Sequence, residues 1–87
     1  MPKFFKSNVR GKKYAVVYNG KLINFGDSNM SHFHDSTGLG LYTYKNHEDP
    51  IRRANYLKRA KGITNKSGEH TYLDKNSANY YSVNYLW

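Results

Sequence analysis

The sequence predicts a small α+β domain, in which a β-hairpin or three-stranded antiparallel sheet is packed by one central α-helix, with a short aromatic C-terminal helix or strand. Three observations lead to this prediction: an Asn-Gly pair between two β-prone runs, a well-capped helix, and a terminus rich in Tyr and Trp. The 87 residues leave room for one domain. Because the chain has no cysteine to brace a thin core, half-buried aromatic side chains are expected to supply much of it.

The N-terminal third is expected to form the sheet. Residues 1–12 are predicted to be a basic arm or an edge strand, and residues 13–25 the hairpin. Asn19-Gly20 separates the two β-prone runs, and both central residues of a type I′ turn need a positive φ, which Asn and Gly adopt at least cost. This pair is the strongest local signal in the chain.

Two stretches are expected to be loops. Residues 26–46 are rich in Gly, Ser, Asp and Asn, which favours a long surface loop, although residues 41–44 could be a short strand or an extended segment. Residues 64–76 contain another turn-rich run, with residues 71–73 as a possible strand.

Residues 50–61 are predicted to be the central helix. Asp49 can accept the free amide protons as the N-cap, and Pro50 suits the first helical position. Gly62 is expected to end the helix in a left-handed conformation. The apolar stripe expected to pack on the sheet consists of Ile51, Ala54, Leu57 and Ala60.

The C-terminal segment, residues 77–87, favours a helix over a strand, with Asp74 or Ser77 as its cap. A helix would place Tyr80, Val83, Leu86 and Trp87 on one face. Trp87 is expected to close the core, and the alternative is an aromatic patch that contacts a partner.

The charge of the chain indicates an anionic partner. Fourteen Lys and Arg against six Asp and Glu give a formal charge of +8, and residues 1–26 and 50–66 each carry six basic and no acidic residues. Guanidinium groups pair with phosphate or carboxylate, so DNA, RNA and an acidic protein surface all remain open, as does a merely solvated helix face. The candidate partner- or phosphate-binding residues are Arg52, Arg53, Tyr56, Lys58, Arg59, Lys61, Arg10, Lys12 and Lys13.

Catalysis and cofactor binding are not expected. No nucleophile motif accompanies the acidic and imidazole groups of residues 47–49, and no full phosphate-loop pattern occurs. The histidines have irregular spacing, so a metal site is not predicted, although a zinc shell remains an alternative for His32, His34, His47 and His70. No apolar run is long enough for a membrane span or targeting segment, so we expect a soluble, intracellular protein.

Two motifs carry a resemblance to a known family. Residues 47–59 read His-Glu-Asp-Pro-Ile-Arg-Arg-Ala-Asn-Tyr-Leu-Lys-Arg, and residues 77–87 read Ser-Ala-Asn-Tyr-Tyr-Ser-Val-Asn-Tyr-Leu-Trp. In this order they resemble a family of small uncharacterised proteins of nucleo-cytoplasmic large DNA viruses, with its His-x-Asp-x-x-Arg-Arg-x-x-Tyr-x-x-Arg run and aromatic Leu-Trp end.

The resemblance implies a viral origin, and we expect a small, basic, non-enzymatic protein of a large DNA virus to be a structural protein. It would be a minor capsid or virion-associated component that joins capsid or other virion proteins through its basic helix and aromatic end. Its expected locations are the virion and, during assembly, the host cytoplasm or viral factory. The alternative is sequence-independent nucleic-acid binding, in which basic side chains contact phosphates.

Overall fold

The computed structural model describes residues 3–87 and confirms the α+β class. Three strands come first, and two helices and two short 3-10 turns follow them. The elements are β1 (Phe4–Lys6), β2 (Lys12–Tyr18), β3 (Lys21–Asp27), η1 (Thr43–Lys45), α1 (Pro50–Ala60), η2 (Thr71–Leu73) and α2 (Ala78–Tyr85).

The strands form an antiparallel sheet in the order β1-β2-β3. Asn19 and Gly20 have φ values of 51° and 74°, so the predicted hairpin turn is confirmed. Within the predicted arm or edge strand, residues 4–6 pair with β2, which confirms the edge-strand alternative for them, whereas residues 1–2 lie outside the described part.

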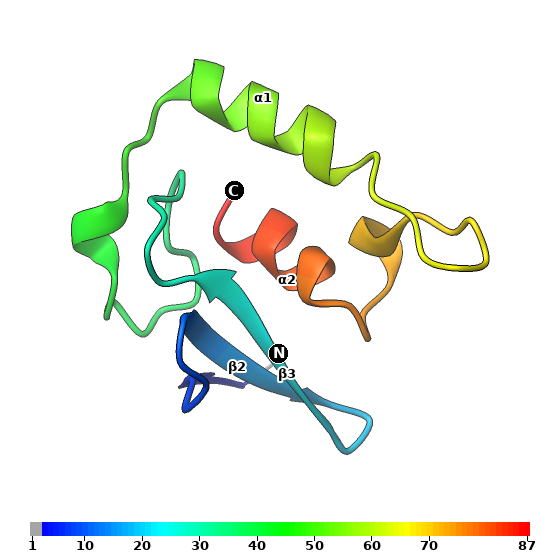
Figure 1. Cartoon of the computed structure of the whole chain (residues 1–87). Coiled ribbons are helices and arrows are strands. Elements are labelled where there is room, and N and C mark those ends of the chain that lie inside the picture. Colours follow the sequence, from blue (N-terminus) through cyan, green and yellow to red (C-terminus); the bar gives the residue numbers. More distant parts are fainter. Residues whose placement is uncertain (1–2) are drawn as a thin grey trace.

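The helices are stacked as successive layers on the sheet. Figure 1 shows α2 between the sheet and α1. Tyr81 of α2 lies 5.7 Å from Phe25 and Tyr85 lies 4.7 Å from Phe4, measured between ring centroids. The helix that covers the sheet is therefore the C-terminal one, and the helix predicted to be central packs on α2 instead.

The predicted apolar stripe of α1 is packed only in its second half, and it does not contact the sheet. Ala60 is buried and Leu57 is half-buried, but Ile51 is 72% exposed and Ala54 is also exposed. Because the tyrosines of α2 already cover the sheet, α1 meets the rest of the molecule mainly through Tyr56 and its last turn.

The start of α1 agrees with the prediction, and its end does not. Asp49 accepts hydrogen bonds from the amides of Ile51 and Arg52, and Pro50 occupies the first turn. Gly62 is not left-handed, so its predicted conformation is wrong. The amides of Gly62 and Ile63 instead donate to carbonyls three residues earlier, which tightens the helix end without a positive φ.

The core is aromatic, as expected, and consists of Tyr14, Val16, Ile23, Phe25, Tyr81 and Leu86. The C-terminal segment is a helix capped by Ser77, so the strand alternative is wrong. Of the expected face, Leu86 is buried, whereas Tyr80, Val83 and Trp87 are half-buried. Tyr81 and Ser82, which were not expected on this face, are buried as well. Trp87 packs against the edge of this core, as expected.

The two loop predictions hold for most residues, although 26–27 belong to β3. Residues 43–45 and 71–73 form single 3-10 turns, so the strands considered near these places are wrong. None of the helices described has the length and apolar character needed to cross a bilayer.

Candidate anion-binding groove

A groove of about 620 Å³ lies between α1 and the end of the hairpin. Its walls come from β2, β3, the loop after β3 and α1, and its floor comes from α2. The lining residues are Lys12, Lys13, Gly26, Asp27, Met30, Ser31, Arg52, Asn55, Tyr56, Arg59, Ala78, Asn79, Ser82, Leu86 and Trp87. Five of the nine candidate residues named from the sequence thus line one groove: Lys12, Lys13, Arg52, Tyr56 and Arg59.

The groove is strongly basic. Its lining contains four Lys or Arg residues and a single carboxylate, that of Asp27. The Nη2 group of Arg52 donates to Ser31 Oγ at 2.9 Å, and the guanidinium of Arg59 lies 5.6 Å from the ring centroid of Tyr56. These contacts hold the guanidiniums in place without neutralising them.

Carboxylates elsewhere do not neutralise the basic residues either. Across residues 3–87 the one imidazole–carboxylate contact joins His34 and Glu48, and no Lys or Arg lies within 4.0 Å of an Asp or Glu side-chain oxygen. Most carboxylates accept backbone hydrogen bonds instead, as Asp49 does at the helix start and Asp27 and Asp74 do in turns. The positive charge is therefore left available to an external anion.

Lys13 lines the groove and is almost fully buried, and we call the part of the groove next to Lys13 its inner end. Its side chain is 2% exposed, and its Nζ donates to the carbonyl of Met30 and to His32 Nδ1, both at 2.7 Å. Burial and the charge of Lys45 lower the pKa of Lys13 from 10.5 to about 8, against the opposing effect of Asp27 and Asp35. The ammonium thus donates hydrogen bonds to two neutral acceptors.

A buried polar network continues from Lys13 into the loop. Because His32 Nδ1 accepts from Lys13, its Nε2 carries the proton and donates to Asn46 Oδ1 at 2.6 Å. Burial and the neighbouring ammonium lower the pKa of His32. Asn46 Oδ1 also accepts from the amide of Asp35, whose carboxylate accepts from the hydroxyl of Tyr14.

Tyr14 and Asp35 end this network with opposite pKa shifts. Burial and the bond to the carboxylate raise the pKa of Tyr14 to about 12. Burial acts to raise the pKa of Asp35, but hydrogen bonds from Thr37 and Tyr14 outweigh it and lower the pKa overall. Asp35 is therefore a structural anion that holds the loop against β2.

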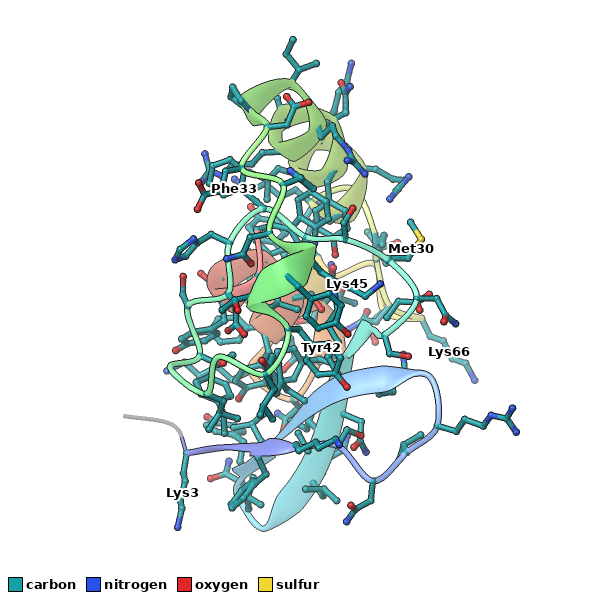
Figure 2. All side chains as sticks on the ribbon, turned by 90° about the vertical axis from the view of Figure 1, so that its left-hand side faces the viewer. Lys3, Met30, Phe33, Tyr42, Lys45 and Lys66 are labelled. Carbon is teal, nitrogen blue, oxygen red and sulfur yellow. The ribbon has the colours of Figure 1, made fainter. Side chains whose placement is uncertain are left out.

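The remaining candidates lie elsewhere. Arg53 and Lys61 line a second hollow of about 340 Å³, where Arg53 Nε donates to the main-chain oxygen of Trp87 at 2.7 Å. The guanidinium of Arg53 also lies 5.2 Å from the ring of Phe33. Phe33, which Arg53 contacts, and Met30, which lines the first groove, lie on opposite sides of the molecule in Figure 2. Arg10 and Lys58 line neither hollow.

Trp87 separates the two hollows and lines both. Its ring is stacked on Tyr56 with centroids 3.9 Å apart and planes at 8°. His47 lies on it as well, at 5.1 Å. Within the aromatic end, Trp87 thus packs against α1, whereas Tyr81 and Tyr85 cover the sheet.

No family model, curated protein or solved structure matches this chain.

The histidines do not converge. Within residues 3–87 no group of three or more His, Cys, Asp or Glu is placed to hold a metal ion. His32 is in the lysine network, His34 pairs with Glu48, and His47 packs on Trp87.

Sequence reasoning missed several residues of the groove. Asn55 lies in the helix between the basic residues and was not distinguished from them by any motif. Ser31 and Met30 come from a loop whose sequence has no regular pattern. The spacing of Arg52, Tyr56 and Arg59 at four and three residues was the usable signal, since it places them on one helix face.

Proposed function

We propose that this protein is a non-enzymatic, sequence-independent nucleic-acid-binding protein that holds phosphate groups in its basic groove. The observation that supports it is the convergence of Lys12, Lys13, Arg52 and Arg59 on one groove, with one carboxylate among the lining residues. Lys and Arg contacts to phosphates supply affinity and carry no base information. The resemblance to proteins of large DNA viruses would make it a virion component associated with the genome.

The chemistry of the groove favours phosphate over an acidic protein surface. Guanidinium groups bind phosphate oxygens through paired hydrogen bonds, and lysine binds them as a point charge. Both kinds of cation line the same groove from two different elements, which suits a strand of closely spaced charges better than a flat surface of scattered carboxylates.

Binding of duplex and single-stranded DNA and of RNA, measured across a salt series, tests the proposal. We expect affinity to fall steeply between about 50 and about 200 mM salt, since binding releases counterions. Arg52→Ala and Arg59→Ala should each reduce the slope of log affinity against log salt by about 1. Lys75→Ala, an exposed residue that lines neither hollow, is the matched control. Absence of binding at the lowest salt, or equal losses in control and groove variants, would contradict the proposal.

A second candidate is a minor capsid role, which the outer face of the sheet favours. Val17 pairs with Leu22 and Phe5 pairs with Ala15, so these side chains share the face turned away from α2. Phe5, Val17 and Leu22 are all exposed there. Such a face suits contact with another protein.

Location within particles distinguishes the two candidates. A shell role predicts that the protein stays with purified capsids emptied of genome, and that Val17→Asn with Leu22→Asn, which leaves the net charge unchanged, releases it without changing nucleic-acid affinity. Recovery only with the released genome would contradict the shell role.

A further inference from the structure

The inner end of the groove holds an ammonium group that lacks a counter-charge. Lys13 Nζ has three N–H donors, and two of them reach the Met30 carbonyl and His32 Nδ1. Neither acceptor is charged, and no carboxylate oxygen lies within 4.0 Å. Burying an ammonium under these conditions is costly, because neutral acceptors replace only part of its hydration.

The groups that surround Lys13 add to the positive charge. Lys45 repels it from the 3-10 turn η1, and Lys12 and Arg52 line the same groove. His32 would add a further positive charge if it were protonated. Asp27 and Asp35 oppose them from a distance, and Asp27 also accepts a hydrogen bond from the amide of Asn29. An anion in the groove would therefore be attracted to this end.

Lys13 and Arg52 are fixed to consecutive residues of one loop. Lys13 donates to the carbonyl of Met30, and Arg52 donates to the hydroxyl of Ser31, the next residue. The two cations therefore contact the same loop and line the same groove, although they come from β2 and α1. Both are held before any ligand arrives, which lowers the ordering cost of binding.

We propose that this end of the groove is a phosphate subsite, in which Lys13 gives its third N–H to one phosphate oxygen and Arg52 and Lys12 hold the others. The inference rests on the proposed nucleic-acid function and names the group that is bound most closely. Phosphate fits because it offers several oxygens to donors from three side chains. The phosphate could belong to the backbone, to a strand end or to free phosphate.

Titration of Lys13 by NMR in the unmodified protein tests this subsite. The Cε–Nζ signals of the lysines would be followed against pH at constant ionic strength with chloride alone, inorganic phosphate, a dinucleotide and a 5′-phosphorylated dinucleotide. A bound anion next to the ammonium should raise the pKa of Lys13 by about one unit or more. Lys75 should not change under any condition.

The three ligands identify the source of the phosphate. A shift with the unphosphorylated dinucleotide indicates the internal phosphodiester, whereas a shift only with its 5′-phosphorylated form indicates a strand end. A shift with inorganic phosphate alone, together with no oligonucleotide binding in the salt series, supports the subsite and contradicts the nucleic-acid function. An unchanged Lys13 in a protein that binds nucleic acid overturns the subsite and leaves the function standing.

A variant gives an independent measurement. Lys13→Met keeps the apolar stem and removes the ammonium, and we expect it to weaken binding of the preferred ligand at least about tenfold, against an unchanged affinity for Lys75→Met. If Lys13→Met does not fold, the NMR titration decides alone, because it needs no substitution. A folded Lys13→Met protein with unchanged affinity would overturn the subsite.

Discussion

Gly26 allows the sheet and the C-terminal helix to approach each other. Its φ is +79°, and a Cβ built there would lie 2.8 Å from Leu86 Cδ1 and 3.3 Å from Lys13 Cβ. We expect Gly26→Ala to lower the free energy of unfolding by about 2 kcal/mol or more, through backbone strain and overpacking. Urea unfolding monitored by circular dichroism measures the loss.

Gly38→Ala is the matched control for Gly26. Gly38 has nearly the same φ, +84°, but a Cβ at this position would have no atom within 4 Å. The free energy of unfolding of Gly38→Ala should therefore fall only by the cost of backbone strain, about 1 kcal/mol. Equal losses in the two variants would mean that the contact with Leu86 contributes nothing.

The buried ammonium of Lys13 should make the free energy of unfolding change with pH in the alkaline range. Its pKa is about 8 in the folded chain against 10.5 when unfolded, so between these values the unfolded chain binds more protons. The free energy of unfolding should therefore rise from about pH 8 toward pH 10. Tyr14, with its pKa raised from 10.0 to about 12, acts in the opposite direction above pH 10.

Unfolding by urea at several pH values, in wild type and Lys13→Met, tests this effect. The variant should lose the rise between pH 8 and pH 10, because the group that titrates differently in the two states is gone. A rise of the same size in both proteins would assign it to the general loss of positive charge instead.

At the scale of elements, α1 is attached chiefly by aromatic stacking. Tyr56 stacks on Trp87, and the carbonyl of Ala60 accepts from Asn79 Nδ2 at 2.8 Å. We expect Tyr56→Ala to cost about 2 kcal/mol and to shift the emission of the single tryptophan to longer wavelength. Hydrogen exchange should accelerate in α1 and remain slow in β2 and β3.

Ile51→Ala is the control on the same helix. Since Ile51 is 72% exposed, we expect a change within about 0.5 kcal/mol and an unchanged emission spectrum. A large loss at Ile51 would show that the face predicted from the sequence is the packed one after all.

Elements with short-range causes could be predicted, and their packing could not. Asn19-Gly20 and Asp49-Pro50 act on backbone groups within a few residues. The hairpin turn and the start of the helix are therefore determined by the local sequence. The place of α1 depends on which helix covers the sheet. Tyr81 and Tyr85 of α2 contact the sheet, so α1 packs on α2 instead. The face of α1 that carries Arg52 and Arg59 was predictable, but the burial of Lys13 was not, because its acceptors come from a loop without periodicity.

For the whole molecule, the decisive feature is a charge of +8 without ion pairs between Lys or Arg and the side chains of Asp or Glu in residues 3–87. Such a chain repels itself, and salt screens the repulsion without breaking stabilising pairs. Raising NaCl from about 0.01 M to about 0.1 M shortens the Debye length from about 30 Å to about 10 Å, so Tm should rise by a few degrees. A fall in Tm would show that stability depends on ion pairs which the structure lacks.

Polyphosphate separates screening from binding. At the same ionic strength it should raise Tm further, because a ligand at about 100 times its Kd adds about 2.7 kcal/mol to the folded state. Lys66→Gln with Lys75→Gln removes two exposed charges that line neither hollow, so it should weaken the response to NaCl and preserve the response to polyphosphate. Arg52→Ala with Arg59→Ala should weaken the response to polyphosphate more than the response to NaCl. Equal behaviour of the two double variants would mean that anions are held by net charge alone, and that the groove has no special part in binding.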